Sequence, residues 1–172
     1  MKKTSPKNLP ALYIGRFQPP HLGHIDAIKQ ILRKEKFLII GIGSAQYFGT
    51  QNNPFTGSQR YSMLTAALQE AKIPQSKYTI IPIPNIEDYA GWPNYVDSLL
   101  PPYGLVYTGS AIVKKLYENQ GKHKIKPIKF RKKISGTLVR EKIMKKENWE
   151  TLVPKSVAKL IKKNLAPAAP AN

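Results

Sequence analysis

The sequence predicts one α/β domain with a mainly parallel sheet and helices on both of its faces. Short apolar runs bounded by turn residues alternate with stretches of helical periodicity, which favours right-handed strand–helix–strand units. A chain of 172 residues can bury a full core, and it has no cysteine for disulfides or thiolate metal sites. In such sheets ligands bind beyond the carboxyl ends of the strands, so the loops there are the candidate site.

The first half of the chain contains three expected strands. Residues 11–14 are a short apolar run ended by Gly15, and apolar residues then recur at helical spacing over 25–32. A second strand over 37–42 leads into a long polar loop over 43–54. Thr56 and Gln59 then form a capping box that opens a helix, which Ile73–Pro74 closes.

Residues 78–83 read as a third strand, which Pro82 and Pro84 push toward the edge of the sheet. A short helix begins at Trp92–Pro93, where proline suits the first turn. A fourth strand at 105–107 ends in Thr108-Gly109-Ser110.

The end of the chain follows the same alternation. A helix over 111–118 is terminated by Gly121, and a fifth strand is expected over 125–130. Further helices open at Ser135 and after Pro154. We predict a single domain over 11–165, a flexible segment over 1–10, and a disordered tail over 166–172, where A-P-A-A-P-A-N lacks periodicity.

The formal net charge of +18 invites the hypothesis of a nucleic-acid partner. Lysines and arginines are densest over 122–133, but such a run is more often a solvated face than a binding groove. A substrate with several phosphates suits the charge equally well. The apolar stretch after the first ten residues is too short for a signal sequence or a membrane span, which favours a cytoplasmic protein.

The loops after residues 14, 42, 107 and 130 are expected to converge on one pocket rich in donors. Arg16, His21 and His24 follow the first strand, and both histidines lie at a helix start, where amide groups and the helix dipole attract anions. Near the late helix start, Ser135, Thr137 and Arg140 supply a second set of donors. No catalytic carboxylate pair or metal-ligand cluster stands out. A site rich in hydrogen-bond donors and poor in catalytic bases fits phosphoryl or nucleotidyl transfer.

Two motifs carry a family resemblance. H-L-G-H at 21–24 resembles the His-x-Gly-His signature of the nucleotidyltransferase superfamily, and I-S-G-T-L-V-R at 134–140 resembles its Ile-Ser-x-Thr-x-x-Arg signature. G-S-A-Q from Gly43, N-P-F-T from Asn53, Trp92 and L-V-P-K from Leu152 follow the order typical of archaeal-type nicotinamide-nucleotide adenylyltransferases. The resemblance implies their Rossmann-like fold.

It also implies an activity, the transfer of the adenylyl group of ATP to the 5′-phosphate of nicotinamide mononucleotide (NMN), or of its nicotinate analogue. The products are NAD and pyrophosphate; Mg²⁺ accompanies ATP, and no tightly bound organic cofactor is implied. The implied catalytic residues are Arg16, His21, His24 and Arg140, and the implied ATP site adds Gly15, Phe17, Gly109, Ser135 and Thr137.

The implied nicotinamide site contains Trp92, whose indole would stack on the pyridine ring by a cation–π contact. Ser44, Asn53 and Phe55 would shape the same pocket. The alternative for Trp92 is a core anchor for its short helix, and Phe55 by itself would be assigned to the core.

Several residues depart from the family pattern. Pro20 stands where phenylalanine usually precedes the first histidine, and Gln59 stands where an acid is usual. After Arg140, Glu141 and Lys142 occupy positions where arginines are common. Lys142, or a lysine of the pair Lys132–Lys133, could replace the second phosphate-binding arginine as a point charge.

Two alternatives stay open. A transferase of the same superfamily could act on pantetheine phosphate, glycerol phosphate or flavin mononucleotide, since these enzymes share His-x-Gly-His. A basic nucleic-acid-binding protein, or a fragment related to class I aminoacyl-tRNA synthetases, is the less favoured alternative. The resemblance also implies homo-oligomers, and the short apolar stretches predict no membrane partner.

Overall fold

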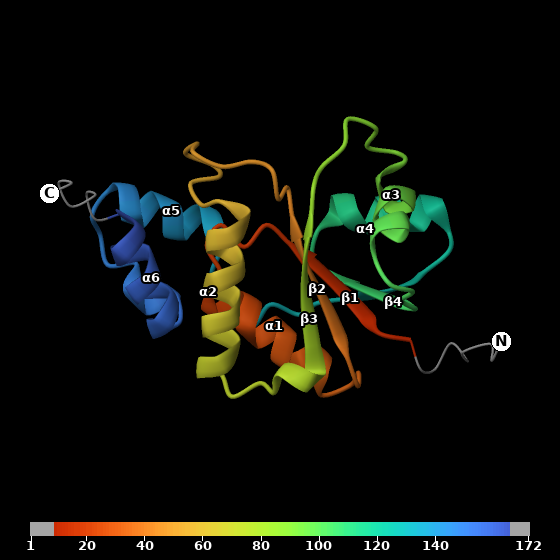
Figure 1. Cartoon of the computed structure of the whole chain (residues 1–172), viewed down its shortest axis with the longest axis horizontal. Helices are drawn as coiled ribbons and strands as arrows, with labels where there is room; N and C mark the ends of the chain where they lie inside the picture. Colours follow the sequence, from red (N-terminus) through yellow and green to blue (C-terminus); the bar gives the residue numbers. More distant parts are fainter. Residues whose placement is uncertain (1–8, 166–172) are drawn as a thin grey trace, which may run out of the picture.

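The computed structural model describes residues 9–165 (Figure 1). Its centre is one parallel sheet with the strand order β3-β2-β1-β4-β5. The strands are β1 (Ala11–Gly15), β2 (Leu38–Gly43), β3 (Tyr78–Ile83), β4 (Leu105–Thr108) and β5 (Lys124–Pro127). The helices are α1 (Leu22–Leu32), α2 (Gly57–Glu70), α3 (Trp92–Leu99), α4 (Ala111–Gln120), α5 (Gly136–Met144) and α6 (Lys155–Leu165). The predicted α/β class is confirmed.

The order of the strands follows from their composition. β2 is buried along its whole length between β1 and β3, as expected of a continuous apolar run inside a parallel sheet. β3 carries Pro82 and lies at one edge, as the prolines predicted. β5 lies at the other edge, where its exposed lysines discourage pairing with a further strand.

Helices cover both faces of the sheet and form two cores. Residues from α1, α2, α5 and α6 pack on one face, represented by Ile28, Leu64, Val139 and Val157, all of them inaccessible to solvent. On the other face, Val96 of α3 packs among the inward side chains of β1, β2 and β4. In Figure 1 the helices α3 and α4 lie on one side of the strands, and α1, α2, α5 and α6 lie on the other. The sheet therefore presents its carboxyl edge between two rigid layers.

Local signals placed the helix starts well. Thr56 caps α2 through the predicted box, with Gln59 N–H donating to Thr56 Oγ1 at 3.1 Å and Thr56 N–H donating to Gln59 Oε1 at 2.9 Å. Helix α1 begins at Leu22, earlier than its apolar periodicity indicated. Glycine and histidine thus occupy its first turn, where no apolar pattern marks them.

The fifth strand differs from its expected range of 125–130, since β5 ends at Pro127. Proline has no N–H to continue the ladder, and only the Ile128 N–H donates onward, to Thr108 O at 3.1 Å. The predicted tail over 166–172 and the first eight residues of the predicted flexible segment lie outside the described residues. Among residues 9–165, no helix combines the length and apolar character needed to cross a bilayer.

Candidate functional site

The carboxyl edge of the sheet carries two separate hollows, where the sequence predicted one pocket. The first, the histidine hollow, has a volume of about 530 Å³ and is lined by His21, His24, Phe130, Lys132, Lys133, Ile134, Ser135 and Gly136. The second, the Trp92 cavity, has a volume of about 350 Å³ and is lined mainly by loops after β1, β2, β3 and β4. The loop between β1 and α1 contributes to both, which makes it the link between them.

His21 and His24 are held together at the start of α1. His21 is the residue before the first helical turn and His24 lies within that turn, so the predicted placement is confirmed. Their rings stack with centroids 3.6 Å apart. The ring centroid of Phe17, in the β1–α1 loop, lies 4.6 Å from that of His24. The two imidazoles therefore form one rigid unit.

A backbone hydrogen bond determines which nitrogen of His24 carries its proton. The His21 N–H donates to His24 Nδ1 at 3.2 Å, so Nδ1 is an acceptor and the neutral ring bears its proton on Nε2. His21 Nδ1 is buried and has no partner among the described residues. A buried polar atom without a partner is costly unless a ligand or water completes it.

Both histidines are neutral in the free protein. Burial lowers the pKa of His21 to about 4. Burial also lowers the pKa of His24 well below its usual range, and the neighbouring His21 lowers it further. The pair thus offers hydrogen-bond donors, with little positive charge until an anion arrives.

The turn that carries these histidines has an unusual backbone. Phe17 has a φ of 50°, a left-handed conformation that is rare for a bulky residue and is often found at functional sites. A Cβ at Gly15 would stand 3.0 Å from the Phe17 ring, so the ring packs closely over the strand end at a residue without a side chain. Gly15 and Phe17, both predicted at the ATP site, lie in this turn.

The second predicted donor set comes from the start of α5. Ser135 caps this helix, its Oγ accepting from the Leu138 N–H at 3.1 Å. Arg140 is buried and donates from Nη1 to Gln18 O at 2.9 Å and from Nη2 to Thr137 Oγ1 at 3.2 Å. Ser135 lines the histidine hollow, whereas Arg140 and Thr137 do not, and Arg140 holds the β1–α1 loop through its bond to Gln18 O. Burial lowers the pKa of Arg140, and Arg16 adds to this effect.

The structure separates the candidate lysines. Lys142 is engaged by Glu147, with Nζ 2.9 Å from the carboxylate oxygen. Lys132 and Lys133 are exposed and line the histidine hollow. Of the three lysines that could replace a phosphate-binding arginine, these two are placed where a polyanion in the hollow would meet them.

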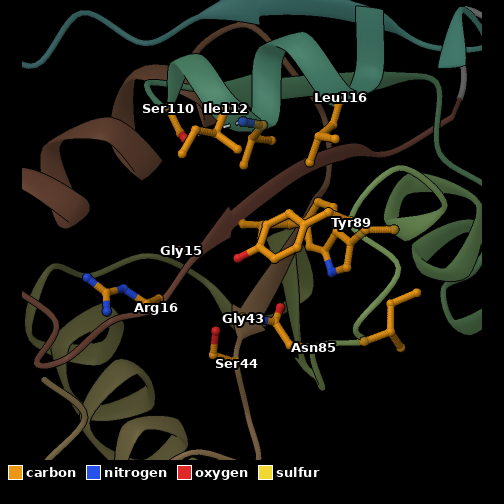
Figure 2. Close-up of a pocket in the computed structure, with 13 residues that line it drawn as sticks. Gly15, Arg16, Gly43, Ser44, Asn85, Tyr89, Ser110, Ile112 and Leu116 are labelled. Carbon is orange, nitrogen blue, oxygen red and sulfur yellow. Dashed lines mark hydrogen bonds between the residues drawn. The ribbon is translucent and has the colours of Figure 1, made fainter. Parts of the chain in front are cut away.

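The Trp92 cavity differs in character from the histidine hollow. Figure 2 shows Arg16 at one end, Tyr89 across the middle, and Ile112 and Leu116 of α4 above them. Its other lining residues are Ile14, Gly15, Gly43, Ser44, Asn85, Ile86, Trp92, Ser110 and Val113. Arg16 carries its only formal charge, so the cavity suits a flat, largely apolar group joined to an anion.

Trp92 lies both in the core and at the wall of the cavity, so its position fits each of the two roles predicted for it. The side chain is 8% exposed, packs edge-on against Tyr117 at 6.2 Å, and belongs to the core that includes Val96. It also lines the cavity, and its buried Nε1 has no partner within residues 9–165. The indole is thus anchored in the core while it forms part of the cavity wall.

The remaining predicted residues are not all gathered at these hollows. Ser44 lines the Trp92 cavity, and its φ of 51° is another left-handed conformation. Asn53 and Phe55 do not line it, because Phe55 is turned into the core and Asn53 lies in a turn with Thr50. Gly109 lies beside Phe130, whose ring a Cβ at Gly109 would strike.

Arg60 organises the loops between the hollows, and sequence reasoning gave it no role. It is fully buried and donates to carbonyl oxygens of Arg16 at 2.9 Å, Gly43 at 3.0 Å and Ser44 at 3.1 Å. Burial lowers its pKa to about 10, with Arg16 contributing. Only main-chain oxygens receive these bonds, so no side-chain motif could have revealed them.

Within the part of the chain that the structure describes, no three side chains of histidine, aspartate or glutamate gather as ligands. The histidine hollow instead offers the hydrogen-bond donors and exposed lysines described above.

Comparisons with known proteins agree with this geometry. The family model described as cytidylyltransferase-like matches residues 12–142. The nicotinamide-nucleotide adenylyltransferase of Thermococcus kodakarensis is 44% identical over 152 residues, which cover 88% of this chain and 81% of the relative. The enzyme of the same name from Pyrobaculum aerophilum is 46% identical over 154 residues, covering 88% and 86%.

Among solved structures, a bifunctional NMN adenylyltransferase/ADP ribose pyrophosphatase from Francisella tularensis superposes with a TM-score of 0.79 at 23% identity. The match covers 90% of this chain and 49% of that one. The same protein has been solved in complex with AMP and a manganese ion. At this identity the likeness supports the Rossmann-like fold.

Proposed function

The chain belongs to the cytidylyltransferase-like family and, within it, to the nicotinamide-nucleotide adenylyltransferases, and from that membership we propose how its two hollows act. The histidine hollow takes the triphosphate of ATP, and the Trp92 cavity takes the pyridine ring of NMN. The observation that supports this division most strongly is the contrast between the hollows: one is lined by donors and lysines, the other by aromatic and aliphatic side chains.

The reaction needs few groups from the protein. A phosphate oxygen of NMN attacks the α-phosphorus of ATP, a P–O bond forms, and the bond to the β-phosphate oxygen breaks to release pyrophosphate. The nucleophile is already an anion, so no proton has to be removed and no general base is required. The protein contributes by holding the reactants in line and stabilising charge in the transition state.

The histidines are arranged to stabilise that charge. His24 Nε2–H is a fixed donor because His24 Nδ1 is engaged by the His21 backbone. The amide groups at the start of α1 add to it, since a helix N-terminus favours anions. A bound triphosphate would raise the low pKa of both imidazoles by supplying opposite charge, and so strengthen the donors when substrate is present.

Arg16, Lys132 and Lys133 provide the charges for the phosphates. Arg16 is exposed and close enough to Arg60 and Arg140 to lower the pKa of each, so the three guanidinium groups make a positive region beside the turn. We assign Arg140 to holding this turn, through its bond to Gln18 O. Mg²⁺ is treated as part of the ATP substrate, coordinated by phosphate oxygens and water.

The test is a coupled pyrophosphate assay with ATP, Mg²⁺ and a panel of acceptors. NMN and nicotinate mononucleotide are compared first, then pantetheine phosphate, glycerol phosphate and flavin mononucleotide. We expect release with the pyridine nucleotides and the highest kcat/KM among all acceptors for one of them. Release only with another acceptor would place the chain elsewhere in the superfamily. Homo-oligomers stay a prediction of the sequence resemblance, and a cytoplasmic location stays a prediction of the sequence.

A further inference from the structure

Three segments of the site meet at one buried residue, Gln18. It lies in the β1–α1 loop, is 2% exposed, and belongs to no position that the proposed chemistry uses. Its carboxamide pairs with both main-chain groups of one residue: Nε2 donates to Phe55 O at 2.8 Å, and Oε1 accepts from the Phe55 N–H at 3.0 Å. This paired contact joins the β1–α1 loop to the residue just before the cap of α2.

The main chain of Gln18 makes a second connection. Its carbonyl oxygen accepts from Arg140 Nη1 at 2.9 Å, and a Cβ on Gly136 would stand only 3.2 Å from it. The start of α5 therefore packs directly on the Gln18 peptide. One residue thus links the turn with the histidines, the end of the β2–α2 loop, and the helix that carries Arg140.

The secondary structure does not depend on these links. β1 is held by its ladders with β2 and β4, and α2 is held by its capping box and by α6. What the Gln18 contacts restrain is the path of the loops at the carboxyl edge, where His21 and Arg140 must keep a set distance. A buried amide pair is a strong restraint, because breaking it leaves a buried N–H and a buried carbonyl unpaired.

We propose that Gln18 is a positioning residue. Its carboxamide fixes the β1–α1 loop, which carries the histidines, relative to Phe55 at the end of the β2–α2 loop, and its carbonyl oxygen ties the same loop to Arg140. This proposal rests on the proposed adenylyl transfer. Loss of the Gln18 contacts should therefore lower kcat, because small displacements of the groups around a reacting phosphorus slow the reaction.

Two substitutions at this position separate hydrogen bonding from shape. Gln18→Met keeps the length of the side chain and removes both bonds. We expect kcat to fall roughly 10- to 100-fold while KM for NMN changes by no more than about twofold, since Gln18 does not line the Trp92 cavity. Gln18→Glu keeps the shape and, when protonated, can donate to Phe55 O and accept from Phe55 N–H.

The glutamate variant therefore supplies a conservative rescue. Burial raises the pKa of such a carboxyl group, so more of it is protonated at lower pH. The kcat of Gln18→Glu relative to wild type should therefore rise about tenfold between pH 8 and pH 6. The same ratio for Gln18→Met should stay flat with pH. A purely structural role would lower stability without this pH-dependent recovery.

Val157→Ala is the matched control for stability. Val157 is fully buried in α6 on the far side of α2, away from both hollows. It should lower the Tm at least as much as Gln18→Met and change kcat by less than about twofold, as ordinary loss of core packing does. Equal kcat losses in both variants, or a normal kcat in Gln18→Met, would overturn the proposal.

A binding measurement keeps the two proposals apart. Wild-type protein that releases no pyrophosphate with any acceptor contradicts the proposed function. The Gln18 proposal is then decided by calorimetric affinity for α,β-methylene-ATP with Mg²⁺. We expect affinity to weaken by about tenfold in Gln18→Met and to stay unchanged in Val157→Ala, as a displaced phosphate site requires; unchanged affinity in both variants would overturn it.

Discussion

The two hollows are built in opposite ways. The histidine hollow is assembled from two short motifs, and its donors are oriented by helix caps and backbone contacts. The Trp92 cavity is assembled from scattered residues of several loops and is anchored by a core tryptophan. Under the proposed function this difference is a division of labour, in which the polar, oriented groups would act on the transition state and the apolar wall would supply affinity for the acceptor.

The largest expected effect is on the histidine side of this comparison. His24→Ala removes the oriented Nε2 donor and should lower kcat by on the order of 100-fold or more. His24→Gln retains a donor at a similar distance and should recover part of the rate. Near-normal turnover of His24→Ala in the pyrophosphate assay would remove this hollow from catalysis.

The next effect belongs to the Trp92 cavity. Trp92→Ala removes the stacking surface and should raise KM for NMN by roughly 10-fold, with a much smaller change in KM for ATP. Trp92→Phe keeps a ring in the wall and serves as the control. If both KM values rise together, Trp92 acts only as a core anchor and the division between the hollows fails.

A smaller effect is expected from the lysines at the rim. Lys133→Ala should raise KM for ATP by about fivefold, and the difference from wild type should shrink at high salt because the contact is exposed. Lys142→Ala is the matched control, since Lys142 is engaged by Glu147. A larger effect at Lys142 than at Lys133 would reverse the assignment.

The free protein should also be sensitive to acid through His21. Its pKa is about 4 in the folded state and near 6.5 when unfolded, so the unfolded chain binds more protons between these values. Stability should therefore fall as pH drops through this window, with a loss in Tm of roughly 5 °C. His21→Gln should show a flatter profile in thermal melts from pH 7 to 4.5. An equal slope in both proteins would contradict the buried, neutral state of His21.

The sequence predicted the fold, and the position of His21, His24 and Ser135 at helix starts, because both depend on local patterns. Alternating apolar runs determine the strands, and His21, His24 and Ser135 lie in contiguous motifs at helix starts. Even here two predicted boundaries differ from the structure: β5 ends at Pro127, and α1 begins before its apolar repeat.

The Trp92 cavity was only partly predictable, because its walls come from residues without a common pattern. Tyr89 and Leu116 join Trp92 there through the topology, whereas Asn53 and Phe55, chosen from a motif, lie elsewhere. The roles of Gln18 and Arg60 were not predicted for another reason. Their partners are backbone atoms distant in sequence, and such contacts leave no signature in the residues that receive them.

The most direct test of the division between the hollows is a crystal structure of the protein with α,β-methylene-ATP, Mg²⁺ and NMN bound together. We expect the triphosphate in the histidine hollow, beside His24 and Lys133, and the pyridine ring in the Trp92 cavity. A pyridine ring outside the Trp92 cavity, or a triphosphate inside it, would contradict the account.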